Sequence, residues 1–382
     1  MNGSIRKRSK GTWQMRYAAP PDGTGKRRYV SETVHGNKKD AERILRERLA
    51  TIENGGYVPC DKETVAAFLD RWLKTYAASN TTLRTQEGYR GNIERYINPS
   101  IGGIPLQNLT GRHIQGMYAE MLERGLSART TLHVHRVLRK ALADAMRWGL
   151  LSRNAADAAT PPRPERKQTD MWDAETIDQF LAAAEDSRFR DLYKLAVWTG
   201  MRRSELAGLK WDHVDLVTCR LSVVATLQRI LGRGLVEGQP KTPRSRRSIA
   251  LAPEAIELLH GIRGRQIEQR LDYGDLRENA GYVFAQDDGK PINPPSVSKD
   301  FGIIVRNVGL PHLTLHGLRH AHATLALTAG VNPKIVSERL GHSSIAVTMD
   351  VYSHVLPGMQ EQAAQAVEEL LSQARRNRLG AI

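Results

Sequence analysis

Apolar residues recur at helical spacing through the second quarter of the chain. In a first stripe, the offsets 0, 3, 4, 7, 8 and 11 of one helical face are occupied by Val65, Phe68, Leu69, Trp72, Leu73 and Tyr76. A second stripe has the same kind of spacing at Ile114, Met117, Tyr118, Met121 and Leu122. Two more helices are predicted over residues 82–97 and 127–148, the latter with Ser127 as its N-cap. The four amphipathic helices predict a helical domain over residues 59–160.

Before this domain, two strand-like segments and a helical segment predict a small α+β domain over residues 1–58. The strands are expected at residues 12–18 and 26–34, with the turn sequence PPDGTG between them. The helix is expected to begin near Asn37 and to end at Gly55-Gly56. Residues 1–48 contain 13 Lys and Arg against 5 Asp and Glu, a net charge of +8. This is typical of a DNA-binding module, although a solvated surface on an ordinary small domain is the open alternative.

A Pro-rich, charged segment after the helical domain predicts a linker at residues 161–168, and a third domain follows over residues 169–358. In that domain Gly200 is expected to end one helix, and Gly341 to end another that begins at Asn332-Pro333. Strands are predicted over residues 220–224 and 246–251. The whole chain is therefore expected to be mainly α and multidomain. It would combine a small α+β N-terminal domain, a four-helix domain, and a mixed, mostly helical domain with a small β-sheet.

The charge of the chain favours a polyanionic partner, most simply nucleic acid. Its 382 residues carry a formal net charge of +15, and its two cysteines lack the spacing of metal ligands. No apolar run approaches the roughly 18 residues of a membrane span, and no apolar stretch follows the basic N-terminus, so a cytoplasmic protein acting on DNA is expected. The side chains predicted to contact DNA are Arg6, Lys7, Arg8, Lys10, Arg27, Arg28, Arg129, Arg136, Arg139, Lys140, Arg244, Arg246 and Arg247.

Two of these groups allow more than one interpretation. The basic residues between Arg129 and Lys140 line either a phosphate-facing side of a helix or an ordinary solvated face. Lys241 and the three arginines after it fall within seven positions that contain no acid. They are interpreted as the cationic tip of a hairpin that fits a DNA groove.

The segment HGLRHAHATLALTAG, residues 316–330, places three histidines and an arginine at the start of an otherwise apolar helix. His316 and His320 have the i, i+4 spacing of helical zinc sites, but Gly317 stands where zinc proteases have Glu, and no further ligand lies nearby. No metal site is therefore predicted. The chain also lacks the Gly-x4-Gly-Lys-Ser/Thr loop of nucleotide hydrolases. Any single histidine here could equally be a hydrogen-bonded core residue.

The order of polar residues along the third domain is more specific than any one of them. Arg202 in TGMRRSEL is followed by Lys241, then by His316 and Arg319 in HGLR, His342 in LGH, and Tyr352, in that order. This order strongly resembles the tyrosine recombinase family, of the phage integrase type. The resemblance covers the third domain, while the helical domain resembles the family's SAM-like core-type DNA-binding domain. The basic N-terminal domain resembles its arm-type, AP2-like domain. His322 departs from the commoner pattern, in which an aromatic residue is frequent.

The resemblance implies a role for each residue of the set, and the chemistry of a phosphodiester agrees with these roles. Arg202 and Arg319 would clamp the non-bridging phosphate oxygens. Tyr352 would be the nucleophile, with His316 the best candidate for the base that assists it. By resemblance, Lys241 would protonate the leaving 5′ oxygen, His342 would hydrogen-bond the phosphate, and Glu205 would orient Arg202 or a histidine. No cofactor is expected, because a phosphotyrosyl link conserves the energy of the broken bond.

The family resemblance also implies an assembly. A homotetramer on two double-stranded attachment sites is expected to integrate and excise a phage genome or another mobile element, with a host DNA-bending protein or a directionality factor as possible partners. A non-catalytic DNA-binding protein and a relaxing topoisomerase are the alternatives. Residues 359–382 predict a C-terminal helix for contacts between protomers, or for docking on its own domain. Its apolar stripe consists of Ala363, Ala366, Val367, Leu370, Leu371 and Ala374.

Overall fold

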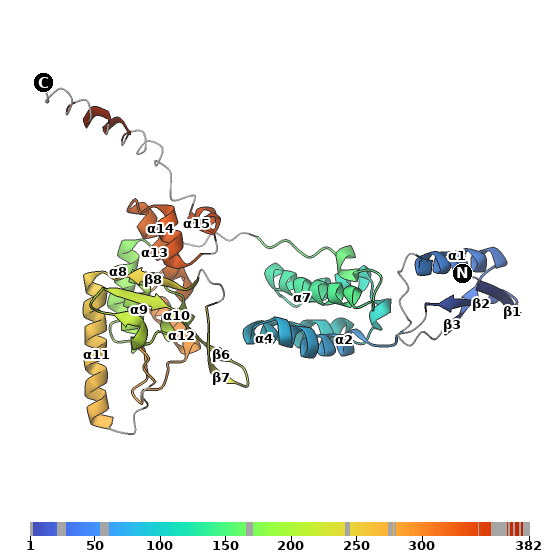
Figure 1. The fold of residues 1–382 in the computed structure, drawn as a ribbon, viewed down its shortest axis with the longest axis horizontal. Helices are drawn as coiled ribbons and strands as arrows, with labels where there is room; N and C mark the ends of the chain where they lie inside the picture. Colours follow the sequence, from blue (N-terminus) through green and yellow to red (C-terminus); the bar gives the residue numbers. More distant parts are fainter. Residues whose placement is uncertain are drawn as a thin grey trace. The chain divides into compact units, whose positions relative to one another are not determined.

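The computed structural model describes most of the chain and divides it into two compact units, residues 1–166 and 167–382. Figure 1 shows the helices and strands of both units. No helix within the described residues is long and apolar enough to cross a membrane. The described residues are 3–20, 28–53, 61–165, 171–240, 245–273, 278, 280–342, 344–352, 365, 367–369, 371–373 and 376.

The first unit begins with a three-stranded antiparallel sheet and one helix that packs on it. The elements are β1 (Gly3–Ser9), β2 (Thr12–Ala19), β3 (Arg28–His35) and α1 (Lys38–Glu53), and the strand order is β1-β2-β3. Met15 and Tyr17 of β2 are buried together with Ala41 and Leu45 of α1, because alternate residues of the strand face the helix. The strands and helix expected from the sequence are present. The sequence pattern does not predict β1, because six of its seven residues are exposed and show no apolar alternation.

The rest of the first unit is helical, and its main helices coincide with the four expected segments. The two earlier segments each contain a π-helical turn, η1 and η2. Phe68 and Trp72 are fully buried, as the apolar stripe predicts. The elements are α2 (Val65–Trp72), η1 (Leu73–Ala77), α3 (Ala78–Asn80), α4 (Leu83–Asn92), η2 (Ile93–Ile97), α5 (Asn98–Ile101), η3 (Leu106–Asn108), α6 (Gly111–Glu123), α7 (Ala128–Arg147) and η4 (Ala155–Ala158).

The second unit packs helices around a small sheet, with a separate two-stranded hairpin. Trp172, Phe180, Tyr193 and Phe301 form an aromatic cluster in its core. The helices are α8 (Ala174–Ala183), α9 (Arg190–Thr199), α10 (Arg203–Ala207), η5 (Trp211–His213), α11 (Pro253–Tyr273), α12 (Pro294–Asn307), α13 (Leu315–Thr328), α14 (Pro333–Leu340) and α15 (Ile345–Tyr352). The strands are β4 (Val214–Asp215), β5 (Arg220–Val223), β6 (Thr226–Ile230), β7 (Gly234–Gly238) and β8 (Arg247–Ala250).

The strands of this unit differ from the expected hairpin in one respect. The predicted strands β5 and β8 are present and pair antiparallel in a sheet of order β4-β5-β8. Between them the chain forms an extra hairpin, β6–β7, whose tip lies at residues 231–233. The cationic run at residues 241–247 therefore follows β7 and leads into β8, so its interpretation as a hairpin tip is wrong. Within the run, residues 241–244 lie outside the described residues.

Candidate active site

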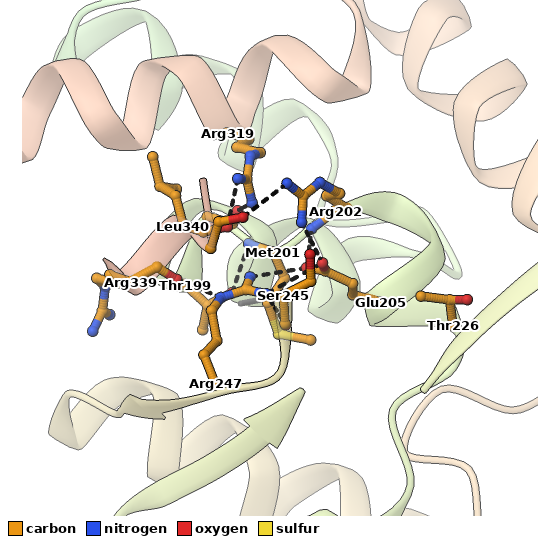
Figure 2. Close-up of polar contacts among 12 residues, drawn as sticks. Thr199, Met201, Arg202, Glu205, Thr226, Ser245, Arg247, Arg319, Arg339 and Leu340 are labelled. Atoms are coloured by element: carbon orange, nitrogen blue, oxygen red, sulfur yellow. Dashed lines mark hydrogen bonds and ion pairs between the residues drawn. The ribbon is translucent and has the colours of Figure 1, made fainter. Parts of the chain in front are cut away.

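Two helix ends meet in the second unit, and each is finished by a glycine in the left-handed conformation. Gly200 caps α9 with a φ of 63°, and Gly341 caps α14 with a φ of 66°. Arg319 of α13 joins the two ends, because its Nη1 donates to the Gly200 carbonyl at 2.8 Å and its Nη2 donates to the Leu340 carbonyl at 2.5 Å (Figure 2). The residue is only 3% exposed. Arg319 thereby bonds carbonyls near the helix ends, where intrahelical partners run out.

Gly200→Ala should destabilise this unit by about 2–5 kcal/mol. A Cβ at this position would lie 2.7 Å from His322 Cδ2 and 2.7 Å from Leu340 Cδ2. Overpacking of this kind costs roughly 1–3 kcal/mol, and a left-handed alanine adds about 1–2 kcal/mol. Denaturant unfolding of the wild type and the variant measures the difference.

The matched control for this substitution is Gly309→Ala. Gly309 has a φ of 72°, but a Cβ there would meet nothing within 4 Å. It should therefore show the cost of the left-handed backbone alone, about 1–2 kcal/mol. Equal losses at Gly200 and Gly309 would contradict the close packing of the two helix ends.

Arg202, at the start of α10, is oriented by the buried carboxylate of Glu205. Its Nη1 donates to Glu205 Oε1 at 2.7 Å, its backbone N–H donates to Glu205 Oε2 at 2.9 Å, and its Nη2 donates to the Gly341 carbonyl at 3.3 Å (Figure 2). This ion pair joins residues at i, i+3 spacing, which are neighbours on a helix. The Arg202 side chain keeps 34% exposure, against 1% for Glu205. Arg202 can therefore present part of its guanidinium to a ligand while the rest stays bonded to the protein.

Glu205 also binds a second arginine, Arg247 of β8. Arg247 Nη2 donates to Glu205 Oε2 at 2.9 Å, and Arg247 Nη1 donates to Oε1 at 3.2 Å. Burial alone would raise the pKa of Glu205, but the hydrogen bonds and charge of Arg247, with those of Arg202, outweigh burial and hold the pKa below its usual range. The Arg247 side chain is 6% exposed. This buried position differs from the DNA-facing position predicted for Arg247.

Arg339, at the C-terminal end of α14, donates hydrogen bonds to residues of α9, β8 and α13. Its Nη2 donates to the Trp198 carbonyl at 2.9 Å, its Nη1 donates to the Ala250 carbonyl at 3.0 Å, and its Nε donates to His322 Nε2 at 3.3 Å. The other ring nitrogen of His322 contacts the Val197 carbonyl at 2.8 Å. His322 therefore supports the packing of α9, α13 and α14. The sequence offers no motif that singles out Arg339.

His316 lies three residues before Arg319 and His342 directly follows Gly341, and both histidines are uncharged at neutral pH. Desolvation by the surrounding protein, with His320, Arg319 and Arg202, lowers the pKa of His316 to about 4, although the residue is exposed at the surface. Desolvation, with Arg319 and Arg202 next in weight, also lowers the pKa of His342 to about 4. A neutral imidazole can accept a proton. Either ring could therefore serve as a base or as a hydrogen-bonding group.

Comparisons with known proteins identify the family to which the chain belongs. The sequence profile of the phage integrase family matches residues 171–375, more than half of the chain. The profile of the phage integrase N-terminal SAM-like domain matches residues 64–122. The chain belongs to the tyrosine recombinases of the phage integrase family. Its enzymatic activity is site-specific DNA recombination.

Individual relatives and solved structures match most of the length of the recombinase. A protein named tyrosine recombinase XerC-like, from Caldanaerobacter subterraneus subsp. tengcongensis, is 29% identical over 87% of this chain and 90% of its own length. A solved structure of the Tn1549 transposon integrase in complex with a circular intermediate DNA has a TM-score of 0.67 at 22% identity, over 81% of this chain and 99% of the other. A lambda integrase tetramer bound to a Holliday junction has a TM-score of 0.56 at 21% identity, over 89% and 95% of the two chains. These structures show that the recombinase shares their fold.

Two residues of the expected catalytic set are not seen in full. Lys241 lies outside the described residues, and only the backbone of Tyr352 is described, as the last residue of α15. His342 connects to that helix, because its Nδ1 lies 2.8 Å from the Oγ1 of the fully buried Thr348. Arg202 and Glu205 contact each other directly, and Arg319 binds the carbonyl of Leu340, next to the Gly341 carbonyl that binds Arg202.

The predicted DNA contacts fall into distinct groups. Arg6, Lys7, Arg8, Lys10, Arg129, Arg136 and Arg246 are exposed. Arg139 is exposed but paired with Asp157 at 2.7 Å, and Lys140 binds the buried Asp144 at 2.8 Å. The charge of Lys140 is therefore already compensated inside the helical domain. Arg27 and Arg244 lie outside the described residues, as does the side chain of Arg28.

The described part of the site suits an anion. It holds two guanidiniums that share one helix end, with neutral imidazoles three residues before Arg319 and directly after Gly341, and no unpaired carboxylate among these groups. Within the described ranges, no three His, Cys, Asp or Glu residues are grouped so that they could hold a metal ion.

Proposed function

We propose that this recombinase cuts and rejoins DNA strands by transesterification through a 3′-phosphotyrosyl intermediate, and that it integrates and excises a phage genome or another mobile element. The observation that carries the proposal is the attachment of Arg202 and Arg319 to consecutive carbonyls of one helix end. Two guanidiniums fixed side by side match the two non-bridging oxygens of a phosphodiester. They would be oriented before the substrate arrives, which is what stabilisation of a transition state requires.

In the proposed reaction the Tyr352 hydroxyl oxygen attacks the phosphorus, and the 5′ oxygen of the DNA leaves. A free phenol has a pKa near 10, so ionising it at pH 7 costs roughly 4 kcal/mol. His316 would accept that proton; its low pKa keeps the ring neutral at pH 7 but makes it a weaker base, so the proton must leave as the oxygen–phosphorus bond forms. Lys241 would give a proton to the leaving oxygen. His342 would hydrogen-bond the phosphate.

The test of this proposal uses candidate attachment-site DNA with a nick beside the cleavage position. The short strand released by cleavage diffuses away, so the covalent complex accumulates. The expected result is a protein–DNA adduct that survives denaturation and is attached through a 3′-phosphate. Strand cleavage that leaves no adduct, or an adduct at a 5′ end, would contradict the proposed chemistry.

The basic N-terminal domain is proposed to bind a second, distal DNA site. Arg6, Lys7, Arg8 and Lys10 are all exposed on or next to β1. A protein that starts at Asp61 should therefore keep cleavage at the core site but lose binding to the distal site. Its affinity for DNA carrying both sites should also depend less steeply on salt, because fewer counterions are released. Titrations at several salt concentrations measure this slope, and an unchanged slope with intact integration would leave the domain without a DNA-binding role.

The C-terminal segment is proposed to contact a neighbouring protomer in a homotetramer acting in the cytoplasm on two DNA sites. Val367 and Leu371, two described members of its apolar stripe, are 57% and 56% exposed. Such a stripe is stabilised when another surface covers it. Deleting everything after Gly358 should weaken tetramer assembly and strand exchange more than binding to a single site. Native gels of synaptic complexes test this, and normal assembly by the shortened protein would rule out docking on a neighbour.

A further inference from the structure

Arg247 is a buried arginine to which the proposed reaction assigns no role. It donates hydrogen bonds to both carboxylate oxygens of Glu205, and its side chain is 6% exposed. We propose that Arg247 is a positioning residue, which holds Arg202 and the end of α14 in the geometry that binds the scissile phosphate. This inference rests on the proposed function of Arg202.

The first contact of Arg247 fixes the carboxylate that orients Arg202. Each oxygen of Glu205 is shared by the two arginines: Oε1 accepts from Arg202 Nη1 at 2.7 Å and from Arg247 Nη1 at 3.2 Å. Oε2 accepts from the Arg202 backbone N–H at 2.9 Å and from Arg247 Nη2 at 2.9 Å. The terminal torsion of a glutamate is broad and easily rotated. The bidentate bond from Arg247 removes that freedom, and so it fixes the oxygen to which Arg202 is attached.

The second contact of Arg247 reaches the end of α14. Its Nε donates to the Arg339 carbonyl at 2.6 Å. The next two carbonyls of the chain, at Leu340 and Gly341, accept from Arg319 and Arg202. Three arginines thus bind three consecutive carbonyls at a helix C-terminus, where the partial charge is negative and cations are stabilised. His342 follows directly, so Arg247 anchors the segment from which all the described phosphate-binding groups except His316 are oriented.

The neighbouring residue Arg246 is placed differently, because its side chain is directed to the solvent. It is exposed, and its Nη2 donates to the side chain of Gln239 at 2.8 Å. Arg246 is open to solvent, whereas Arg247 faces a carboxylate that is 1% exposed. Two adjacent arginines therefore offer a matched pair: one accessible to solvent and one directed inward.

The test compares Arg247→Met, Arg247→Lys and Arg246→Met on nicked attachment-site DNA with two kinds of scissile linkage. One is the normal phosphate, and the other is a methylphosphonate, in which a methyl group replaces one non-bridging oxygen and the linkage is neutral. On the phosphate, Arg247→Met should slow formation of the covalent complex at saturating DNA by roughly 10- to 100-fold, as loss of a group that orients a binding residue commonly does. DNA affinity should be unchanged.

On the methylphosphonate the deficit of Arg247→Met should shrink to a few-fold, because that linkage presents no negative charge for a well-placed Arg202 to neutralise. Arg247→Lys keeps the charge but cannot form the bidentate bond, so it should fall between the wild type and Arg247→Met. Arg246→Met should weaken DNA binding to the same extent for both linkages, without the linkage-dependent rate deficit of Arg247→Met. Melting curves establish that each variant is folded, and Arg247→Lys keeps the test decisive if the methionine variant does not fold.

Two results would overturn the proposal. An equal rate deficit on both linkages would show that Arg247 only supports the fold. Weaker binding with a smaller salt slope, at an unchanged rate on saturating DNA, would show a direct phosphate contact. Arg202→Ala, measured alongside, separates this inference from the proposed function. If the methylphosphonate fails to rescue Arg202→Ala, the phosphate-binding role of Arg202 is wrong, whereas rescue of Arg202→Ala without rescue of Arg247→Met refutes the positioning role alone.

Discussion

Tyr352→Phe should form no covalent protein–DNA complex on nicked attachment-site DNA, while its affinity for the site stays unchanged. The substitution removes only the oxygen that would bond to phosphorus and leaves the rest of Tyr352, the last residue of α15, unchanged. Most of the binding free energy comes from many phosphate contacts elsewhere, so one hydroxyl contributes little to it. Denaturing gels measure the adduct, and gel shifts measure affinity on the same DNA.

The control for this variant is Tyr29→Phe, which removes the hydroxyl of a tyrosine that is 59% exposed on β3. It should form the adduct at the wild-type rate. A denaturation-resistant adduct in Tyr352→Phe would show that another residue is the nucleophile. The opposite failure, loss of DNA binding together with the adduct, would show that the ring itself shapes the DNA-binding surface.

Local sequence signals were sufficient to predict the structure where it depends on residues close together in the chain. Gly200 and Gly341 end helices as expected, because a left-handed cap favours glycine whatever the surroundings. The pairing of Arg202 with Glu205 follows from the i, i+3 spacing at a helix start. The apolar stripes predicted buried faces correctly, as at Phe68 and Trp72. In each case the partner lies within about one helical turn or along one face.

Contacts between distant segments could not be predicted in the same way. Arg246 and Arg247 are identical in type and adjacent in sequence, yet only Arg247 is directed toward Glu205, 42 residues earlier. Nothing in the local pattern distinguishes them, because the direction of a side chain on a strand depends on which face the rest of the fold covers. For the same reason the sequence does not predict the contacts of Arg339, whose hydrogen-bonding partners include Trp198 and Ala250. The order of the polar residues singled out Arg202 and Arg319, but it did not identify Arg247 and Arg339, which hold the surrounding segments in place.

Arg202→Ala should slow DNA cleavage by about 10²–10³-fold with little loss of stability. Removing one preorganised donor from a developing negative charge typically costs about 3–4 kcal/mol of barrier. The fold should tolerate the change, because Glu205 keeps both hydrogen bonds from Arg247 and so does not become an unpaired buried charge. The rate of adduct formation on nicked DNA, at saturating protein, measures the effect. Arg203→Ala is the matched control, since Arg203 is exposed and its Nη1 donates to Ser298 Oγ at 2.6 Å.

Arg319→Ala, unlike Arg202→Ala, should destabilise the protein as well as slow DNA cleavage. Arg319 is buried and satisfies the carbonyls of Gly200 and Leu340. Its removal leaves two buried acceptors without that partner, at roughly 1–3 kcal/mol each, so the protein should lose stability as well as cleavage. The contrary result would be that both variants lose only stability, or that Arg202→Ala cleaves at the wild-type rate. Either outcome would show that these guanidiniums hold the helix ends together and do not bind the scissile phosphate.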